Sequence, residues 1–117
     1  MASDCIFCKI ASGEIQGTIV YETEDVIAFE DANPQMPVHT LIIPKAHYAN
    51  IGDGVPEDIL GKVFGAVGPV AEIKGLTERG YRIVVNTGED GRQTVHHLHV
   101  HLLGGAKMPI TMGPVDE

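Results

Sequence analysis

The chain has 117 residues, 44% of them hydrophobic, and its 16 acidic and 8 basic side chains give a net charge of −8 at pH 7. This length suits a single domain over residues 1–117, and the acidic charge excludes the basic surface that binds long nucleic acid. No segment approaches the roughly 20 apolar residues of a membrane span, and the first residues do not resemble a secretory leader. We therefore expect a cytoplasmic protein with neither a membrane nor a nucleic acid as partner.

The first part of the chain predicts a short helix followed by three strands. Apolar residues at positions 6, 7 and 10 precede Gly13, which is typical of a short helix that ends at glycine. The expected strands are TIVYE (18–22), VIAFE (26–30) and VHTLIIP (38–44). Between the last two, DANPQMP (31–37) has the composition of a turn.

A longer helix is predicted in the middle of the chain. Pro56 suits a first helical position, and apolar residues recur after it with helical spacing. Pro69 and three glycines interrupt this pattern, so we expect a kink near Gly65. Gly75 would cap the C-terminal end of the helix.

Two further strands complete the expected fold. YRIVVNT (81–87) and TVHHLHVHLL (94–103) flank GEDGRQ, whose Asp-Gly pair favours a hairpin with a longer loop. Residues 106–117 contain two prolines and are expected to form an irregular tail. The sum is an α+β domain with a five-stranded antiparallel sheet, one long helix and one short helix.

Three histidines alternate with apolar residues in the last of these strands. In a strand, His97, His99 and His101 would share one face at a spacing of about 7 Å, with His96 on the other face. Such a row can bind a metal ion. It can also attack phosphorus, with one imidazole as nucleophile and its neighbours handling protons. A merely polar surface is the third interpretation, and the spacing alone does not separate them.

Several blocks of the sequence resemble one known family. HLHVHLL (97–103) is similar to the H-φ-H-φ-H-φ-φ signature (φ apolar) of the histidine triad, or HIT, family. CIFCKIASGEI, VIAFEDANPQMPVHTLIIPKAH, GYRIVVNTGEDGRQTV and HLHVHLLGG resemble blocks of its Hint branch, the purine nucleoside phosphoramidases. The resemblance implies a HIT-like fold and a homodimer in which two sheets join into one of ten strands.

The resemblance also implies a reaction, the hydrolysis of nucleoside 5′-phosphoramidates. By position, His99 attacks the α-phosphorus, expels the amine and carries a nucleotidyl-imidazole intermediate that water cleaves. His101 contacts the phosphate and assists the leaving group, while His97 holds the nucleophile's orientation, backed by His39. This reaction requires no metal. A nucleotide-binding regulatory module with little catalysis, or a zinc-binding protein that uses the histidine cluster, remains the alternative.

The same pattern implies a site for a purine nucleoside monophosphate or phosphoramidate. Asp31 would accept hydrogen bonds from the ribose hydroxyls. Arg92 stands where the family usually has glycine, and it either adds a charge to the phosphate or crowds the turn. The other residues assigned to the phosphate and the base are Ala32, Asn86, Gln93, Thr94, Ile6, Phe7, Ile10 and Phe29. Core packing is the alternative for Ile6, Phe7, Ile10 and Phe29, and it explains Ile10 at least as well. Turn capping is the alternative for Asp31 and Asn86.

The two cysteines form a C-x-x-C motif that is typical of a metal or redox pair in a reducing compartment. Resemblance to some relatives implies a structural zinc ion held by Cys5, Cys8, His47 and His97. His96 is an alternative fourth ligand, because zinc on His97 would remove that ring from a proton relay. Two reduced, free cysteines are the other interpretation.

Overall fold

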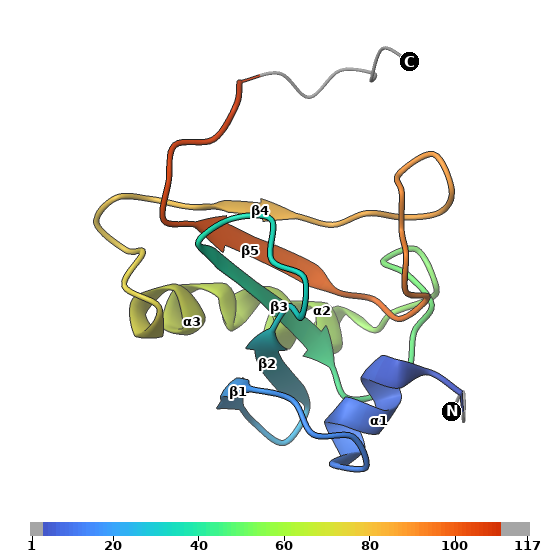
Figure 1. The fold of residues 1–117 in the computed structure, drawn as a ribbon. Coiled ribbons are helices and arrows are strands. Elements are labelled where there is room, and N and C mark those ends of the chain that lie inside the picture. Colours follow the sequence, from blue (N-terminus) through green and yellow to red (C-terminus); the bar gives the residue numbers. More distant parts are fainter. Residues whose placement is uncertain (1–3, 111–117) are drawn as a thin grey trace.

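The protein, described here by a computed structural model for residues 4–110, is built around one antiparallel sheet (Figure 1). Within these residues the sheet has five strands in the order β1-β2-β3-β5-β4. They are β1 (Ile19–Glu22), β2 (Val26–Glu30), β3 (Val38–Pro44), β4 (Arg82–Val84) and β5 (Val100–Gly104). All four strand pairings are antiparallel, which confirms the predicted α+β fold class.

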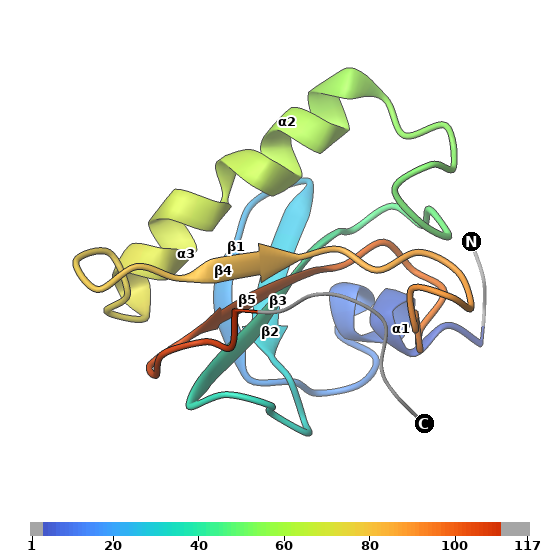
Figure 2. The ribbon, with the colours of Figure 1, turned by 90° about the horizontal axis from the view of Figure 1, so that it is seen from above.

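Helices cover both faces of this sheet, so β2 and β3 are buried on both sides (Figure 2). On one face, Ala28 and Ile42 pack against Val63 and Val70 of the long helix. On the other face, the alternate strand residues pack against Phe7 of the N-terminal helix. Because successive strand residues point to opposite faces, each of these strands contributes to both core clusters.

The short N-terminal helix, α1 (Ile6–Ser12), begins and ends as its sequence indicates. Its N-cap is Cys5, whose Sγ accepts a hydrogen bond from the backbone N–H of Cys8. Its C-cap is Gly13, at φ 85°, a left-handed conformation that glycine adopts without steric cost. The helix is confirmed where the apolar pattern and Gly13 predicted it.

The long helix is present as two segments, α2 (Glu57–Gly65) and α3 (Val67–Ile73). The break falls at Ala66, next to the predicted kink, because Pro69 has no N–H to donate to the preceding turn. Pro56 is the N-cap rather than the first helical residue. Gly75, at φ 75°, donates to the carbonyl of Glu72 at 3.1 Å and ends α3 as predicted.

The last two strands are shorter than predicted. β4 spans three residues rather than 81–87, and β5 begins at Val100 rather than at residue 94. A bend precedes β5, in which the N–H of His97 bonds to the carbonyl of Val95 at 2.9 Å and the N–H of Leu98 to that of Tyr48 at 2.7 Å. These bonds replace the strand ladder, so of the three histidines only His101 lies within β5. The predicted row on one strand face is wrong for His97.

The chain after β5 is irregular as far as the structure describes it. Residues 106–110 form neither helix nor strand, and the rest of the predicted irregular tail, 111–117, lies outside the described residues. Among residues 4–110, no helix has the length and apolarity that crossing a membrane requires.

Candidate active site and metal cluster

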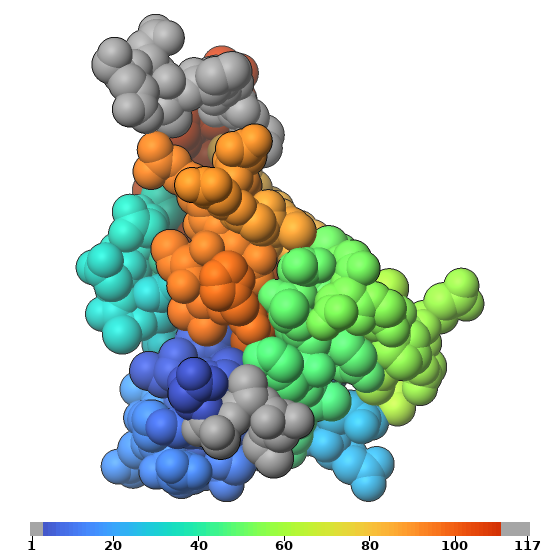
Figure 3. Space-filling model, turned by 90° about the vertical axis from the view of Figure 1, so that its right-hand side faces the viewer, coloured from blue at the N-terminus to red at the C-terminus, as the bar shows by residue number. Residues whose placement is uncertain are grey.

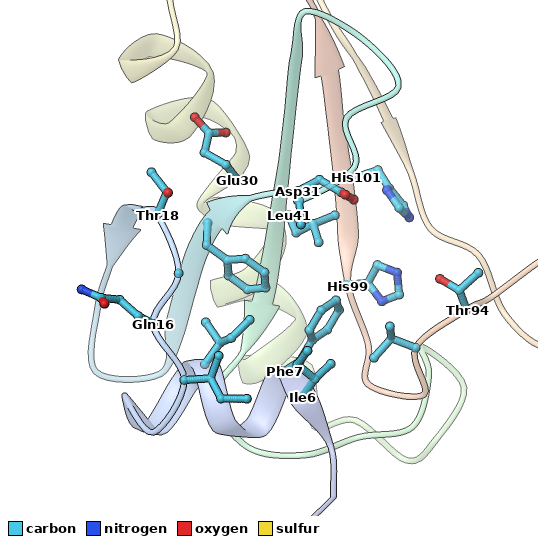
Figure 4. A pocket seen from close by; sticks show the side chains of 16 residues that line it. Ile6, Phe7, Gln16, Thr18, Glu30, Asp31, Leu41, Thr94, His99 and His101 are labelled. Atoms are coloured by element: carbon cyan, nitrogen blue, oxygen red, sulfur yellow. The ribbon is translucent and has the colours of Figure 1, made fainter.

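A cavity of about 500 Å³ opens between α1 and the sheet face that α1 covers (Figure 4). The residues that the sequence assigned to the base, Ile6, Phe7, Ile10 and Phe29, all line it. The sequence analysis missed further lining residues, among them Ile15, Gln16, Thr18 and Leu41. Strand alternation could have identified Leu41, because it is paired with Phe29 across β2 and β3 and shares its face.

One side of the cavity carries the chemically reactive groups. His99, His101, Asp31, Ala32 and Thr94 all line it, as the sequence analysis expected (Figure 4). His97 does not, because the bend before β5 turns its ring away from the cavity and toward α1. The three histidines of the motif therefore divide between two different sites.

The hydrogen bonds of His99 define which of its nitrogens is free. Its Nδ1 lies 2.7 Å from the backbone carbonyl of His97. A carbonyl oxygen only accepts hydrogen bonds, so Nδ1 carries the proton and Nε2 keeps its lone pair. His99 is 4% exposed and its ring lies edge-on to that of Phe7, with 5.2 Å between centroids. The ring is thus fixed with a nucleophilic nitrogen available.

The tautomer of His101 is set by a chain of two hydrogen bonds. The backbone N–H of Gln35 donates to Nδ1 of His39 at 2.9 Å, so the proton of His39 is on Nε2. That Nε2 lies 2.8 Å from Nδ1 of His101, which must accept. His101 therefore carries its proton on Nε2 and is a hydrogen-bond donor. His39 supports His101 and not His97, which corrects the arrangement expected from the sequence.

Asp31 both caps its turn and faces this histidine pair. Its Oδ1 accepts from the backbone N–H of Asn33 at 2.7 Å, the capping role that was one of its two interpretations. Its Oδ2 lies 3.4 Å from Nε2 of His39. One carboxylate oxygen is thus used locally, and the other faces His39, on a residue that lines the cavity.

Burial keeps the motif histidines neutral at pH 7. Desolvation lowers the pKa of His97 and of His99 below the ordinary value of 6.5. The pKa of His101 falls to about 4, first through burial and then through repulsion from His99 and His39, with Asp31 opposing. Nε2 of His99 is therefore not protonated at neutral pH, as a nucleophile requires.

This shift predicts how stability changes with pH. Between pH 6.5 and about 4, the unfolded chain binds a proton at His101 that the folded protein does not, so the free energy of unfolding falls as the pH falls. One such proton contributes a slope of about 1.4 kcal/mol per pH unit. Urea unfolding of the wild type and His101→Gln across this range measures the slope. The free energy of unfolding of His101→Gln should fall less per pH unit than that of the wild type. Equal slopes for the two proteins would contradict the prediction.

The loop before the histidines is held in shape by Gln93. The side chain of Gln93 accepts from the N–H of Gly88 at 3.0 Å and donates to the carbonyls of Ala49 at 2.7 Å and Val95 at 3.0 Å. Its amide is therefore engaged by the backbone, and a direct side-chain contact with phosphate, as the sequence analysis expected, would break these bonds. Neither Asn86 nor Arg92 is among the residues that line the cavity.

The backbone of this loop requires glycine at position 91 and adopts a left-handed conformation at Arg92. A Cβ on Gly91 would lie 2.6 Å from the carbonyl oxygen of Thr87, closer than side chains approach backbone. Arg92 is exposed and adopts φ 61°, the only positive φ at a non-glycine residue between residues 4 and 110. This is the left-handed conformation that glycine favours, so the loop retains at Arg92 the backbone that a glycine would adopt.

Gly91→Ala is expected to destabilise the protein by about 2 kcal/mol, because the backbone of the loop must move to admit the Cβ. Gly61→Ala on the exposed face of α2 is the matched control. A Cβ there meets nothing within 4 Å, so alanine should stabilise by about 0.5–1 kcal/mol. Urea denaturation measures both. Equal effects of the two substitutions would show that close packing does not constrain Gly91.

A second group of side chains meets at the N-terminus of α1. Nδ1 of His97 lies 3.4 Å from Sγ of Cys5, 3.5 Å from Sγ of Cys8 and 3.2 Å from Nδ1 of His47. Sγ of Cys8 lies 3.2 Å from Nδ1 of His47. In the space-filling view, the blue start of α1 contacts the green segment that follows β3 and the orange segment that precedes β5 (Figure 3). We call these four residues the metal cluster.

The spacing of the metal cluster fits a tetrahedral zinc ion. Zn–S bonds of about 2.3 Å and Zn–N bonds of about 2.0–2.1 Å place tetrahedral ligand atoms about 3.3–3.8 Å apart. The observed separations of 3.2–3.5 Å lie near this range. His97 is fully buried, and its Nε2 donates to the carbonyl of Pro44 at 2.8 Å, which leaves Nδ1 free to bind a metal. His97, and not the alternative His96, belongs to the cluster.

Comparison with known proteins gives consistent matches over most of the chain. Residues 12–108, which contain all six histidines, match the family model described as the HIT domain. The purine nucleoside phosphoramidase of Escherichia coli K12 is 43% identical over 107 residues, 90% of either chain. A 14 kDa zinc-binding protein of Zea mays is 49% identical over 110 residues, 91% of this chain and 85% of that protein. The structure of a HIT family hydrolase from Clostridium thermocellum matches with a TM-score of 0.90 and 47% identity, covering 96% of this chain and 99% of that one.

Proposed function

Because the chain belongs to the HIT family, as the match over residues 12–108 shows, we propose that it hydrolyses the P–N bond of purine nucleoside 5′-phosphoramidates. One observation carries the proposal. The bond from Nδ1 of His99 to the carbonyl of His97 leaves a neutral, nucleophilic Nε2 on a ring that lines an apolar cavity. A relative that is named a purine nucleoside phosphoramidase, 43% identical, supports the choice of substrate.

In the proposed complex the base lies between the apolar walls of the cavity. The rings of Phe7 and Phe29 pack edge-on, with 5.3 Å between their centroids, and together with Ile6 and Ile10 they would contact the base. Asp31 lines the same cavity as the histidines, and its Oδ2, which also faces His39, has a further lone pair that suits the ribose hydroxyls. The α-phosphate then falls beside His99, His101 and Thr94.

The first proposed step transfers the nucleotide to the protein. Nε2 of His99 forms a bond to the α-phosphorus, and the P–N bond breaks with its electron pair going to the amine, which takes a proton from water. The positive charge on the imidazole is stabilised because Nδ1–H already donates to the carbonyl of His97. Nε2–H of His101 donates to the phosphoryl group or the leaving nitrogen, as its tautomer allows.

The second proposed step regenerates the protein. Water attacks the phosphorus, the bond to Nε2 of His99 breaks with its electron pair returning to the ring, and the proton of the water goes to solvent. Nucleoside monophosphate is released. The two steps together consume one water molecule, and no metal ion takes part in either, in keeping with the separation of the metal cluster from the cavity-lining histidines.

We also propose that the metal cluster holds a structural zinc ion. When bound, zinc would connect three segments through its coordination bonds: α1, the segment after β3 and the segment before β5. A relative named a 14 kDa zinc-binding protein, 49% identical, supports this choice of metal. Protein purified without added zinc should contain about one equivalent, and His47→Ala should contain none. A metal-free wild type would support the free-cysteine interpretation.

A homodimer is the third part of the proposal. β4 is an edge strand, paired only with β5 among the described residues, and can pair with β4 of a second copy to give the expected ten-stranded sheet. Ile83 in this strand and the neighbouring Tyr81 are 40% and 43% exposed, which suits an interface. Sedimentation equilibrium measures the state, and a monomer at micromolar concentration would contradict it.

The experiment that tests the reaction is hydrolysis of adenosine 5′-phosphoramidate in EDTA, followed by release of AMP. Turnover supports metal-independent phosphoramidase activity. Acid quenching during turnover should trap adenylate bound to protein through a histidine, which distinguishes a covalent route from direct attack by water. Binding of AMP without any turnover would instead support the regulatory-module alternative.

A further inference from the structure

The metal cluster and the nucleotide cavity are built from the same short helix. The proposed ligands Cys5 and Cys8 lie at the N-cap of α1 and within it, and the same short segment carries the cavity residues Ile6, Phe7 and Ile10. The helix has only seven residues, too few for a helix to be stable in isolation. Its position therefore depends on the contacts that hold it, and the cluster supplies those at its N-terminal end.

A second connection between the two sites runs through His97. Its ring belongs to the metal cluster, whereas its carbonyl accepts the hydrogen bond from Nδ1 of the nucleophile His99 at 2.7 Å. The peptide that carries this carbonyl lies in the bend before β5, where one bond from the N–H of Leu98 to the carbonyl of Tyr48 stands in place of a strand ladder. Fixing the ring of His97 through a metal at Nδ1 and the bond to Pro44 at Nε2 therefore also fixes the acceptor that orients His99.

Phe7 connects the sites a third time. Its ring lies edge-on to His97 and His99, with centroid distances of 6.1 Å and 5.2 Å, and it lines the cavity as well. A shift of α1 would change the base wall and the packing around the nucleophile together. The cluster is thus connected to the cavity through α1 with its residue Phe7, and separately through the backbone carbonyl of His97.

We propose that the metal cluster is a positioning device for the nucleotide site, so that metal binding and nucleotide binding favour each other. This inference rests on the nucleotide binding proposed above. Because binding free energies are linked reciprocally, metal should tighten nucleotide binding by the same factor by which nucleotide tightens metal binding. We expect a factor of at least tenfold, within the usual range of such coupling.

The experiment uses the full chain loaded with Co²⁺, whose visible bands report on the geometry of thiolate and imidazole ligands. Titration with AMP should shift these bands, with a midpoint equal to the Kd that calorimetry gives for the same protein. Calorimetry on metal-free protein should give a Kd at least tenfold weaker. Saturating AMP should also make the protein release Co²⁺ to a chelator at least tenfold less readily.

Two variants separate positioning from mere stabilisation. His96→Ala removes an exposed histidine next to the cluster and should keep the metal, the spectral shift and the AMP affinity. His47→Ala removes a ligand that does not line the cavity, and it should weaken AMP binding while circular dichroism shows a folded protein. If the metal-free chain unfolds, the cobalt spectrum still tests the proposal, because a site that serves stability alone would not respond to AMP.

The outcomes distinguish the two proposals. AMP that binds without changing the cobalt bands, and with equal affinity for the metal-free and loaded proteins, would overturn the coupling and leave the proposed reaction intact. A loaded protein that binds no AMP would overturn both. Binding and a spectral shift without hydrolysis of the phosphoramidate would overturn the reaction alone.

Discussion

Replacement of His99 by alanine is expected to lower the hydrolysis of adenosine 5′-phosphoramidate by about 10⁴-fold or more. The imidazole is proposed to form the bond to phosphorus, and alanine has neither the nucleophilic nitrogen nor the N–H that donates to the carbonyl of His97. Steady-state release of AMP measures the loss. The trapped adenylate should also disappear, because it forms on this ring.

Two controls make this result specific to the nucleophile. His99→Ala should still bind AMP, since the walls of the cavity and Asp31 are unchanged. His96→Ala should keep full activity, because His96 is exposed and does not line the cavity. Turnover in His99→Ala within tenfold of the wild type would rule out the covalent mechanism.

Replacement of His101 by alanine should cost about 10²–10³-fold in kcat/KM. The ring is held by His39 as a neutral donor with its proton on Nε2, and the loss of one such donor to a developing charge has this magnitude. His101→Gln retains an N–H donor on a side chain of similar reach and should recover part of the activity. Steady-state kinetics of both variants, at a pH well above 6.5, measures the difference.

The leaving group identifies which atom receives this hydrogen bond. A loss that is equal for alkylamine and arylamine substrates would assign it to a phosphoryl oxygen. A larger loss with the more basic alkylamine would assign it to the leaving nitrogen. Less than a tenfold loss in His101→Ala, with either substrate, would contradict the donor role.

The sequence predicted the fold well wherever one local rule acted alone. The short apolar runs of β2 and β3, the stop of α1 at Gly13 and the kink near Gly65 all follow from neighbours within a few residues. The resemblance, and not these local patterns, identified the apolar walls of the cavity. Leu41 was missed although its position on β3 was implied, because the resemblance and not the pairing of strands selected the base residues.

The errors arose where distant parts of the chain act on one segment. His97 leaves the histidine row because Tyr48, about fifty residues away, bonds to the next residue and because Cys5 and Cys8 lie on the side to which its ring turns. Gln93 was assigned to phosphate on the resemblance alone. Its side-chain bonds to Gly88 and Ala49, which the sequence does not show, engage the amide that such a contact would need. Local spacing cannot show such bonds, and a resemblance transfers a role without the packing that decides it.

The acceptor that orients His99 is a peptide carbonyl and not a side chain. No amino-acid substitution at position 97 removes that oxygen, so a scan of alanine variants would record only the loss of the ring of His97. Replacing the following amide by an ester would instead weaken the carbonyl as an acceptor. It would also remove the N–H that Leu98 donates to Tyr48, while every side chain stays unchanged. The tautomer of the nucleophile therefore depends on the path of the backbone and not on the identity of a neighbouring side chain.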